Sequence, residues 1–163
     1  MTKAASCRSD QMEIIIDSRE KRRVIAPIIE YFDTHGVVWV SNALPVGDYM
    51  SFDNARKVID RKHNLQELAA NCSEPDIKRF RAELERAKKL GVQLVILCEH
   101  SNRIKCLEDV ILWENPVCKK HPLAMSGERL FKVLFQLRDN YGFEIEFCDK
   151  RHTGAEIVRI LNE

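Results

Sequence analysis

Residues 44–62, which read LPVGDYMSFDNARKVIDRK, decide the fold that we expect for this chain. The mainly apolar segments 44–52 and 57–62 flank Asp53, Asn54 and Ala55, which favour a turn. Two strand-like segments around a short turn are typical of a β-hairpin. We therefore predict two antiparallel strands that enter the core together.

Two carboxylates and one lysine lie on this hairpin. Asp48 and Asp60 are on opposite arms, and Lys62 follows Asp60 by two residues. Alternate residues of a strand face the same side, so Asp60 and Lys62 are expected to project together toward Asp48. Carboxylate oxygens are ligands for Mg²⁺, and a nearby ammonium stabilises charge that develops on a phosphate. This pattern, written PD-(D/E)xK, favours phosphodiester hydrolysis, although D-x-K alone occurs by chance in many chains.

Strands and helices alternate through the rest of the chain. The apolar run 92–98 predicts a central parallel strand that is covered on both faces. Further strands are expected at 12–17, 37–40 and 143–148, with helices from Pro27 to Gly36, after the cap Asn64, and at 75–90, 126–141 and 155–161. Segment 104–113 is assigned to a short helix and 115–125 to the longest loop. The pattern predicts a three-layer α/β/α fold with a mixed sheet.

Composition sets the class of protein. The 163 residues are 45% apolar and 31% charged, which suits one globular domain over 12–163 after a short disordered start at 1–11. The net charge of +1 provides no overall basic field for nucleic acid. The chain has neither an apolar signal region near its start nor a run long enough to span a membrane, which predicts a cytoplasmic protein without membrane contact.

The six cysteines are widely spaced and contain no CxxC pair, so we expect reduced thiols. Cys118 with His121, and Cys148 with His152, are the pairs spaced closely enough to consider zinc. No further residues complete a tetrahedral site, so structural zinc is not expected. Cys98 and Cys148 are instead predicted to be small buried hydrophobic residues at strand ends.

Three motifs in order make the hairpin pattern more specific. IDSRE at 16–20, LPVGDY at 44–49 and VIDRK at 58–62 closely resemble the XPF-type structure-specific nuclease family, which has a D-S-R-E strand end, an L-x-V-G-D-Y arm and a V-E-R-K arm. The resemblance covers residues 13–100 well and extends to the C-terminus as one nuclease domain. It implies a restriction-endonuclease-like α/β fold.

The resemblance implies roles for the matched residues. Asp48 and Asp60 would be metal ligands for Mg²⁺ or Mn²⁺, with the main-chain carbonyl of Arg61 as a further ligand. Lys62 would be the catalytic lysine. Glu20 would approach the metal or its water from the end of the first strand. The Arg61 side chain would orient the carboxylates or contact the substrate backbone.

Other positions are supporting or depart from the family. Asp17 and Arg19 would shape the first strand end, and Arg19 would also meet a phosphate. The family usually has Glu at the position of Asp60, and its acid four residues after the lysine is replaced by Gln66. Glu67, one position later, would serve near the metal or merely complete the capping box that begins at Asn64.

The helix at 75–90 has a basic start. Lys78, Arg79 and Arg81 are close in sequence to the expected site and are candidates to grip phosphates, which would make binding salt-sensitive. Glu83 and Glu85 share the helix, so pairing at i,i+4 spacing is the alternative explanation for these charges.

We therefore expect a divalent-metal endonuclease that acts on DNA. The preference for branched, flap or junction DNA is implied by the resemblance only, as is the likeness to short stand-alone bacterial or phage members. A homodimer, or a separate DNA-targeting subunit, would then provide further contacts to the DNA substrate. Two alternatives stay open at this point: a non-catalytic DNA-binding partner module, and an RNA-processing or restriction-type nuclease on the same scaffold.

Overall fold

The computed structural model describes residues 12–100 and 103–163, so the predicted disordered segment 1–11 lies outside the described residues. Six strands form one sheet in the order β2-β1-β3-β4-β5-β6. Their bounds are β1 Glu13–Asp17, β2 Val38–Asn42, β3 Tyr49–Ser51, β4 Lys57–Lys62, β5 Gln93–Cys98 and β6 Glu144–Phe147.

The sheet is mixed, as predicted. Strands β1 and β2 are parallel, the pairs β1–β3 and β3–β4 are antiparallel, and β4, β5 and β6 run parallel to one another. The hairpin β3–β4 thus lies in the middle of the sheet and joins its two parallel parts. The site residues of the hairpin are therefore held by strands on both sides.

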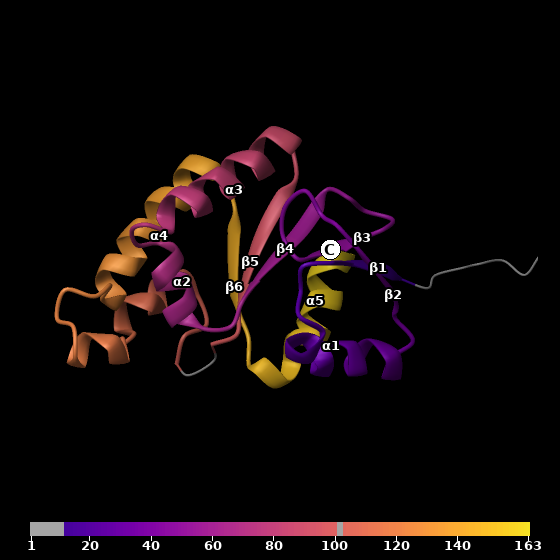
Figure 1. The fold of residues 1–163 in the computed structure, drawn as a ribbon, viewed down its shortest axis with the longest axis horizontal. Coiled ribbons are helices and arrows are strands. Elements are labelled where there is room, and N and C mark those ends of the chain that lie inside the picture. The colour runs from indigo at the N-terminus through magenta and orange to yellow at the C-terminus, as the bar shows by residue number, and fades with distance from the viewer. Residues whose placement is uncertain (1–11, 101–102) are drawn as a thin grey trace, which may run out of the picture.

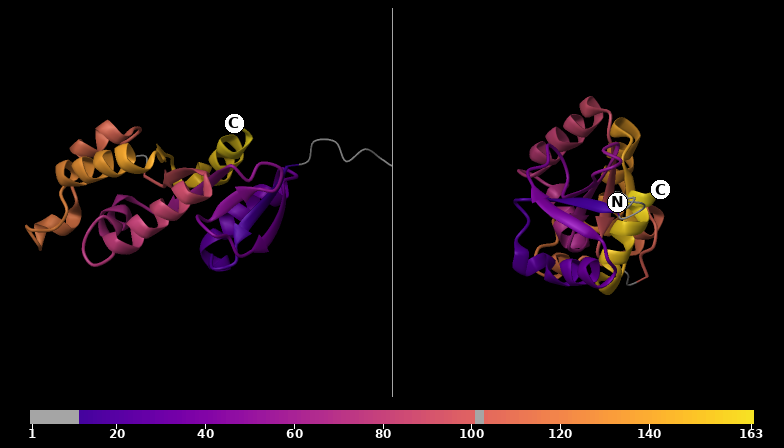
Figure 2. Two further views of the ribbon diagram at one scale, coloured as in Figure 1. Left: turned by 90° about the horizontal axis from the view of Figure 1, so that it is seen from above. Right: turned by 90° about the vertical axis from the view of Figure 1, so that its right-hand side faces the viewer.

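Helices cover both faces of the sheet and produce three layers (Figure 1). One layer holds α2 Leu65–Asn71, α3 Ile77–Leu90 and α4 Gly127–Tyr141, with the short 3₁₀ segments η1 Leu107–Leu112 and η2 Pro116–Lys119. The other holds α1 Arg22–Thr34 and α5 Thr153–Asn162, which follows the 3₁₀ turn η3 Lys150–His152. Seen from above, the indigo N-terminal elements and the orange α4 lie at opposite ends of the molecule (Figure 2).

Strand alternation divides the core in two. Along β5, Leu94, Ile96 and Cys98 pack toward α2, α3 and α4, whereas Val95 and Leu97 pack toward α1 and α5. This two-sided burial confirms β5 as a central parallel strand. It also fixes which helical layer each side chain of the neighbouring β4 faces.

The first helix begins earlier than predicted. Helix α1 starts at Arg22, so Pro27 lies inside it rather than in its first turn. Ile25, Ile28 and Phe32 are all buried, which extends the apolar stripe by one turn toward the N-terminus. Burial of Ile25 explains why the helix forms ahead of the proline.

The remaining elements follow the expected order. Asn64 and Ser126 cap α2 and α4 through their side chains, as their types suggest. Segment 104–113 contains the 3₁₀ helix η1, and the long loop contains the short turn η2. Among residues 12–100 and 103–163, no helix combines the length and apolar character that crossing a membrane requires.

Candidate active site

The hairpin fixes Asp48 to the main chain of its neighbours. The amide of Asp48 donates to the carbonyl of Ile59 at 2.7 Å, and the carbonyl of Asp48 accepts from Asp17 N at 2.8 Å. Its carboxylate Oδ2 accepts from the Arg61 amide at 2.8 Å. Asp48 is therefore held between β1 and β4, with its carboxylate against the segment that carries Asp60 and Lys62.

Gly47 allows this close approach. Its φ is +70°, and an added Cβ would lie 2.4 Å from Val58 Cγ1 and 2.9 Å from the carbonyl oxygen of Ile59. A side chain would therefore be strained in the backbone and would collide with β4. The glycine before Asp48 is required by this turn.

Asp60 and Lys62 project from the same face of β4, as predicted. Lys62 Nζ lies 2.9 Å from Asp60 Oδ1 and 2.8 Å from Oδ2, and both side chains are less than one-tenth exposed. The ammonium also lies over the ring of Phe80 on α3, 5.6 Å from its centre. Burial would lower the pKa of Lys62, but Asp60, Asp48 and Glu83 raise it, so this lysine is held as a cation.

The acids crowd one another. Burial, then Asp60 and Glu20, raise the pKa of Asp48 well above its usual range, while the bond from Arg61 N opposes that rise. Like charges in a partly desolvated site disfavour the ionised carboxylate unless a cation is added. The electrostatics of the site therefore favour a positive ligand.

These side chains open on a cleft of about 220 Å³ between the hairpin and α3. Helix α3 contributes Arg79, Phe80 and Glu83, which share one helical face, and the N-cap residue Asp76 precedes them in the cleft wall. Arg19, Glu67 and Asn71 complete the wall beside Asp48, Asp60 and Lys62. The sequence-based set of Asp48, Asp60 and Lys62 is thus gathered in one place.

Glu83 is a cleft residue that the sequence argument assigned only to helix pairing. Glu85 forms an i,i+4 pair with Lys89, at 3.7 Å, but Glu83 turns toward the cleft. Burial and the neighbouring Asp60 raise the pKa of Glu83. Its helical spacing from Arg79 was the available signal, since residues four apart share a face.

The end of β1 is braced by Asp17 and Arg19. Asp17 Oδ1 and Oδ2 accept from Arg19 Nε and Nη2 at 2.8 and 2.6 Å, and Asp17 Oδ2 also accepts from Leu44 N at 2.9 Å. Burial alone would raise the pKa of Asp17, but these bonds lower it. The Arg19 side chain stays 70% exposed, so it reaches the rim of the cleft while it shapes the strand end.

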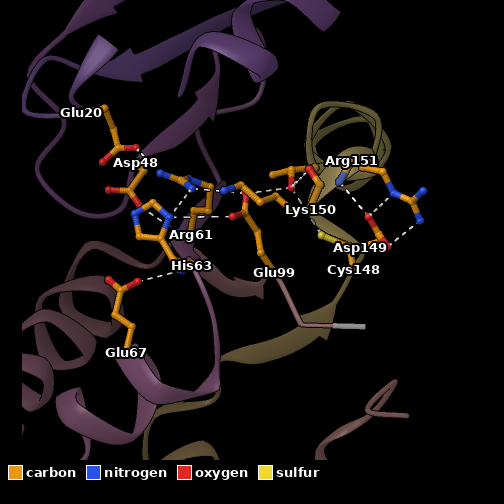
Figure 3. Close-up of polar contacts among 11 residues, drawn as sticks. Glu20, Asp48, Arg61, His63, Glu67, Glu99, Cys148, Asp149, Lys150 and Arg151 are labelled. Carbon is orange, nitrogen blue, oxygen red and sulfur yellow. Dashed lines mark hydrogen bonds and ion pairs between the residues drawn. The ribbon is translucent and has the colours of Figure 1, made fainter. Parts of the chain in front are cut away.

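Arg61 faces the opposite side of β4 from Asp60 and Lys62. Its guanidinium Nη2 donates to Glu20 Oε2 at 3.0 Å, and Nη1 donates to Glu99 Oε1 at 3.3 Å. Figure 3 shows Arg61 between these two acids, with Glu20 beside Asp48. Glu99 was not among the predicted site residues, because it follows β5 outside the three motifs.

Other predicted site residues are distributed differently. Glu67 lines the cleft, and its backbone N donates to Asn64 Oδ1 at 2.9 Å, which is one half of the predicted capping box. Its Oε2 accepts at 2.7 Å from the amide of His63, the residue before the cap Asn64, so the second bond of the box is replaced by a bond one residue earlier. Gln66 and Lys78 are exposed and are not part of the cleft wall, and Arg81 lines a separate groove beside Leu123 and Met125. Of the three basic residues at the start of α3, only Arg79 lies at the cleft.

The donor set is compatible with a hard divalent cation, although it is sparse. Within residues 12–100 and 103–163, no three His, Cys, Asp or Glu side chains form a group that could hold a metal ion. Mg²⁺ is nevertheless often bound by one or two carboxylates together with waters and substrate phosphates. The mutual repulsion of Asp48 and Asp60 and their opening on a polar cleft fit such a site.

Comparison with known proteins places the chain in a family. The model of the ERCC4 domain matches residues 16–161, which is most of the chain. The chain belongs to the ERCC4 domain family. Membership confirms the resemblance to XPF-type nucleases, whereas the narrower likeness to bacterial or phage members stays a prediction.

A solved structure has the same fold as this chain. XPF from Aeropyrum pernix superimposes with a TM-score of 0.65 at 16% sequence identity, and the match covers 92% of this chain and 63% of that one. The chain thus spans less than two thirds of that protein. No curated protein shows significant sequence similarity to the chain. The structural match supports the restriction-endonuclease-like α/β fold.

Proposed function

We propose that this ERCC4-domain protein is a divalent-metal-dependent endonuclease that hydrolyses DNA phosphodiester bonds, with branched, flap or junction DNA as its substrate. The observation that carries the proposal is the meeting of Asp48, Asp60 and Lys62 in one open polar cleft. Membership of the ERCC4 domain family supports it independently. An inactive partner module would have no need to keep both acids and the lysine together.

Each side chain has a distinct task in this mechanism. Asp48 and Asp60 would hold Mg²⁺ or Mn²⁺, and Glu20 would reach the metal-bound water from beside Asp48. A bound divalent cation supplies a more acidic water and neutralises charge on the phosphate. Lys62 orients the attacking water and stabilises charge on the phosphate oxygens. Its ion pair with Asp60 keeps the ammonium at the site before substrate arrives.

Exposed cations at the rim are suited to hold the DNA backbone. Arg19 and Arg79 line the cleft, and their side chains are 70% and 78% exposed. Arg79 pairs only loosely with Asp76, at 3.5 Å, so a phosphate can replace that partner. Lys78 and Arg81 would contact more distant phosphates, and a homodimer or a DNA-targeting subunit would extend the grip.

Cleavage assays test the proposal. Labelled junction, flap and linear DNA, together with RNA of the same sequence, are incubated with Mg²⁺, Mn²⁺ or EDTA. We expect metal-dependent cuts near the junction, and their loss in Asp48→Asn and Lys62→Ala. Glu128→Gln, which changes an exposed acid on α4, is the matched control. Circular dichroism verifies that each variant is folded.

Two outcomes would replace the proposal. Tight binding of junction DNA without cleavage in any metal would identify a non-catalytic DNA-binding module. Preferential cleavage of RNA, or of linear duplex at a short sequence, would identify an RNA-processing or restriction-type nuclease on the same scaffold.

A further inference from the structure

Arg61 lies in the interior between two carboxylates of different exposure. Its side chain is 3% exposed, that of Glu99 is 2% exposed, and that of Glu20 is 21% exposed. Burial would lower the pKa of Arg61, but Tyr49, Glu99 and Glu20 raise it, so the guanidinium remains charged. Arg61 therefore has one carboxylate partner beside Asp48 and one in the core, and His63 Nδ1 lies 3.1 Å from its Nη1 (Figure 3).

Strand geometry places Glu99 on the α1/α5 side of the sheet, opposite the side from which Asp60 and Lys62 project. Residues 95 and 97 of β5 face the α1/α5 layer, and Glu99 continues that alternation one step past the strand. The Glu99 amide donates to the Lys62 carbonyl at 2.8 Å, which extends the pairing of β4 with β5. This contact sets the Glu99 side chain beside Arg61, because Arg61 projects from the same face of β4.

Helix α5 fixes the Glu99 carboxylate from behind. The hydroxyl of Thr153, the first residue of α5, donates to Glu99 Oε1 at 2.8 Å and also lies 3.1 Å from the Lys150 carbonyl. Gly154 packs so closely on Tyr31 of α1 that an added Cβ would lie 2.7 Å from that side chain. The start of α5 is therefore fixed against α1, and Glu99 has a rigid support.

We propose that Glu99 is a positioning residue that acts through Arg61 and leaves Glu20 free to serve the metal site. The inference rests on the proposed function, because it concerns the same cleft. Because Arg61 bonds both acids, it keeps the Glu99 carboxylate as a partner when Glu20 turns toward the proposed metal site. Without the Glu99 carboxylate, Glu20 would be the only carboxylate that Arg61 bonds within the described residues, and Arg61 would hold it back.

Glu99→Gln tests this directly, because glutamine keeps the shape and removes the charge. We expect the single-turnover cleavage rate at saturating DNA to fall about 10- to 100-fold, the range typical of residues that support metal ligands. The affinity for DNA should not change. Glu146→Gln, which changes a half-buried acid on β6 that pairs with Arg159 away from the cleft, is the matched control and should cleave at the normal rate.

A double-mutant cycle distinguishes a positioning role of Glu99 from a general loss of cleavage activity. If Glu99 acts through Glu20, then Glu20→Gln should slow cleavage strongly in the native background and weakly in Glu99→Gln. Independent, multiplicative effects would overturn the proposal. If Glu99→Gln fails to fold, Thr153→Val replaces it, and its loss of one hydrogen bond should slow cleavage about five-fold with the same coupling to Glu20.

Two measurements without cleavage separate this inference from the proposed function. Calorimetric titration with Mn²⁺ should show weaker binding in Glu99→Gln, and the loss should shrink when Glu20→Gln is already present. The side-chain ¹⁵N signals of Arg61 should shift in Glu99→Gln. If the native protein cuts no DNA but these results hold, the proposed function fails and the positioning role stands. Unchanged Mn²⁺ affinity, or an unmoved Arg61 signal, would overturn the positioning role.

Discussion

The Arg61 main-chain amide donates to the Asp48 carboxylate at 2.8 Å. One acid of the proposed metal site is therefore bonded to the residue that separates the other acid, Asp60, from the lysine, Lys62. The bond spans the hairpin and fixes Asp48 without using the Arg61 side chain. The same residue therefore organises both faces of β4, through its amide at the cleft and its guanidinium toward Glu20 and Glu99.

The raised pKa of Asp48 predicts a pH-dependent stability. The pKa of Asp48 is higher in the folded protein than in the unfolded chain, where the pKa of an aspartate is about 3.9. Its contribution to stability is therefore complete at pH values below the unfolded pKa and is lost as the pH rises through the folded pKa. Metal-free Asp48→Asn should therefore gain free energy of unfolding relative to the native chain as pH rises above about 4. Urea unfolding in EDTA at several pH values measures this difference.

Saturating Mg²⁺ should reverse that trend, because it binds the ionised carboxylate and stabilises the native chain more as pH rises. Asp48→Asn should lose most of this gain. Stability curves of the two proteins that run parallel across the pH range would show that Asp48 is not perturbed.

Removal of the buried ammonium should destabilise the metal-free protein. Lys62→Met keeps the chain length but leaves Asp60, Asp48 and Glu83 without their shared cation, which should cost about 3 kcal/mol of unfolding free energy in EDTA. Lys89→Met breaks the exposed pair with Glu85 and should cost less than about 1 kcal/mol. Chemical denaturation of both variants gives the comparison, and equal losses would argue against a buried charge cluster.

The turn before Asp48 should tolerate no side chain. Gly47→Ala combines a positive φ with a collision against β4 and should lower stability by about 2–3 kcal/mol, with weaker Mn²⁺ binding because Asp48 moves. Gly91 has a similar φ of +67° but no atom within 4 Å of an added Cβ, so Gly91→Ala should cost only about 1 kcal/mol. Thermal unfolding with and without Mn²⁺ distinguishes the two, and an equal loss would contradict the steric argument.

Arg79 should contribute to DNA affinity through phosphate contact. Arg79→Ala should weaken binding to all DNA sequences similarly and reduce the slope of log affinity against log salt by about one unit. Lys132→Ala changes an exposed cation on α4 and should leave the slope unchanged. Fluorescence anisotropy in EDTA over a range of salt concentrations measures both, and an unchanged slope in Arg79→Ala would remove it from the interface.

Much of the hairpin and its chemistry could be predicted from local sequence. The alternation of β4 predicted that Asp60 and Lys62 share a face, and the structure confirms it with their direct ion pair. Asn64 was predicted as a helix cap from residue type and spacing, and its side chain accepts the expected bond from Glu67 N. The start of α1 was misplaced, because the pattern alone gave Pro27 more weight than the buried Ile25.

The sequence by itself determined the order of the motifs and the two-residue spacing that pairs Asp60 with Lys62. It also determined that a glycine, Gly47, stands at the turn that positions Asp48. Tertiary structure alone decided that Glu99 and Thr153 would lie next to Arg61. The physical reason is that these contacts join elements far apart in the chain. They depend on the parallel pairing of β4 with β5 and on the packing of α5 against α1, which no local periodicity records.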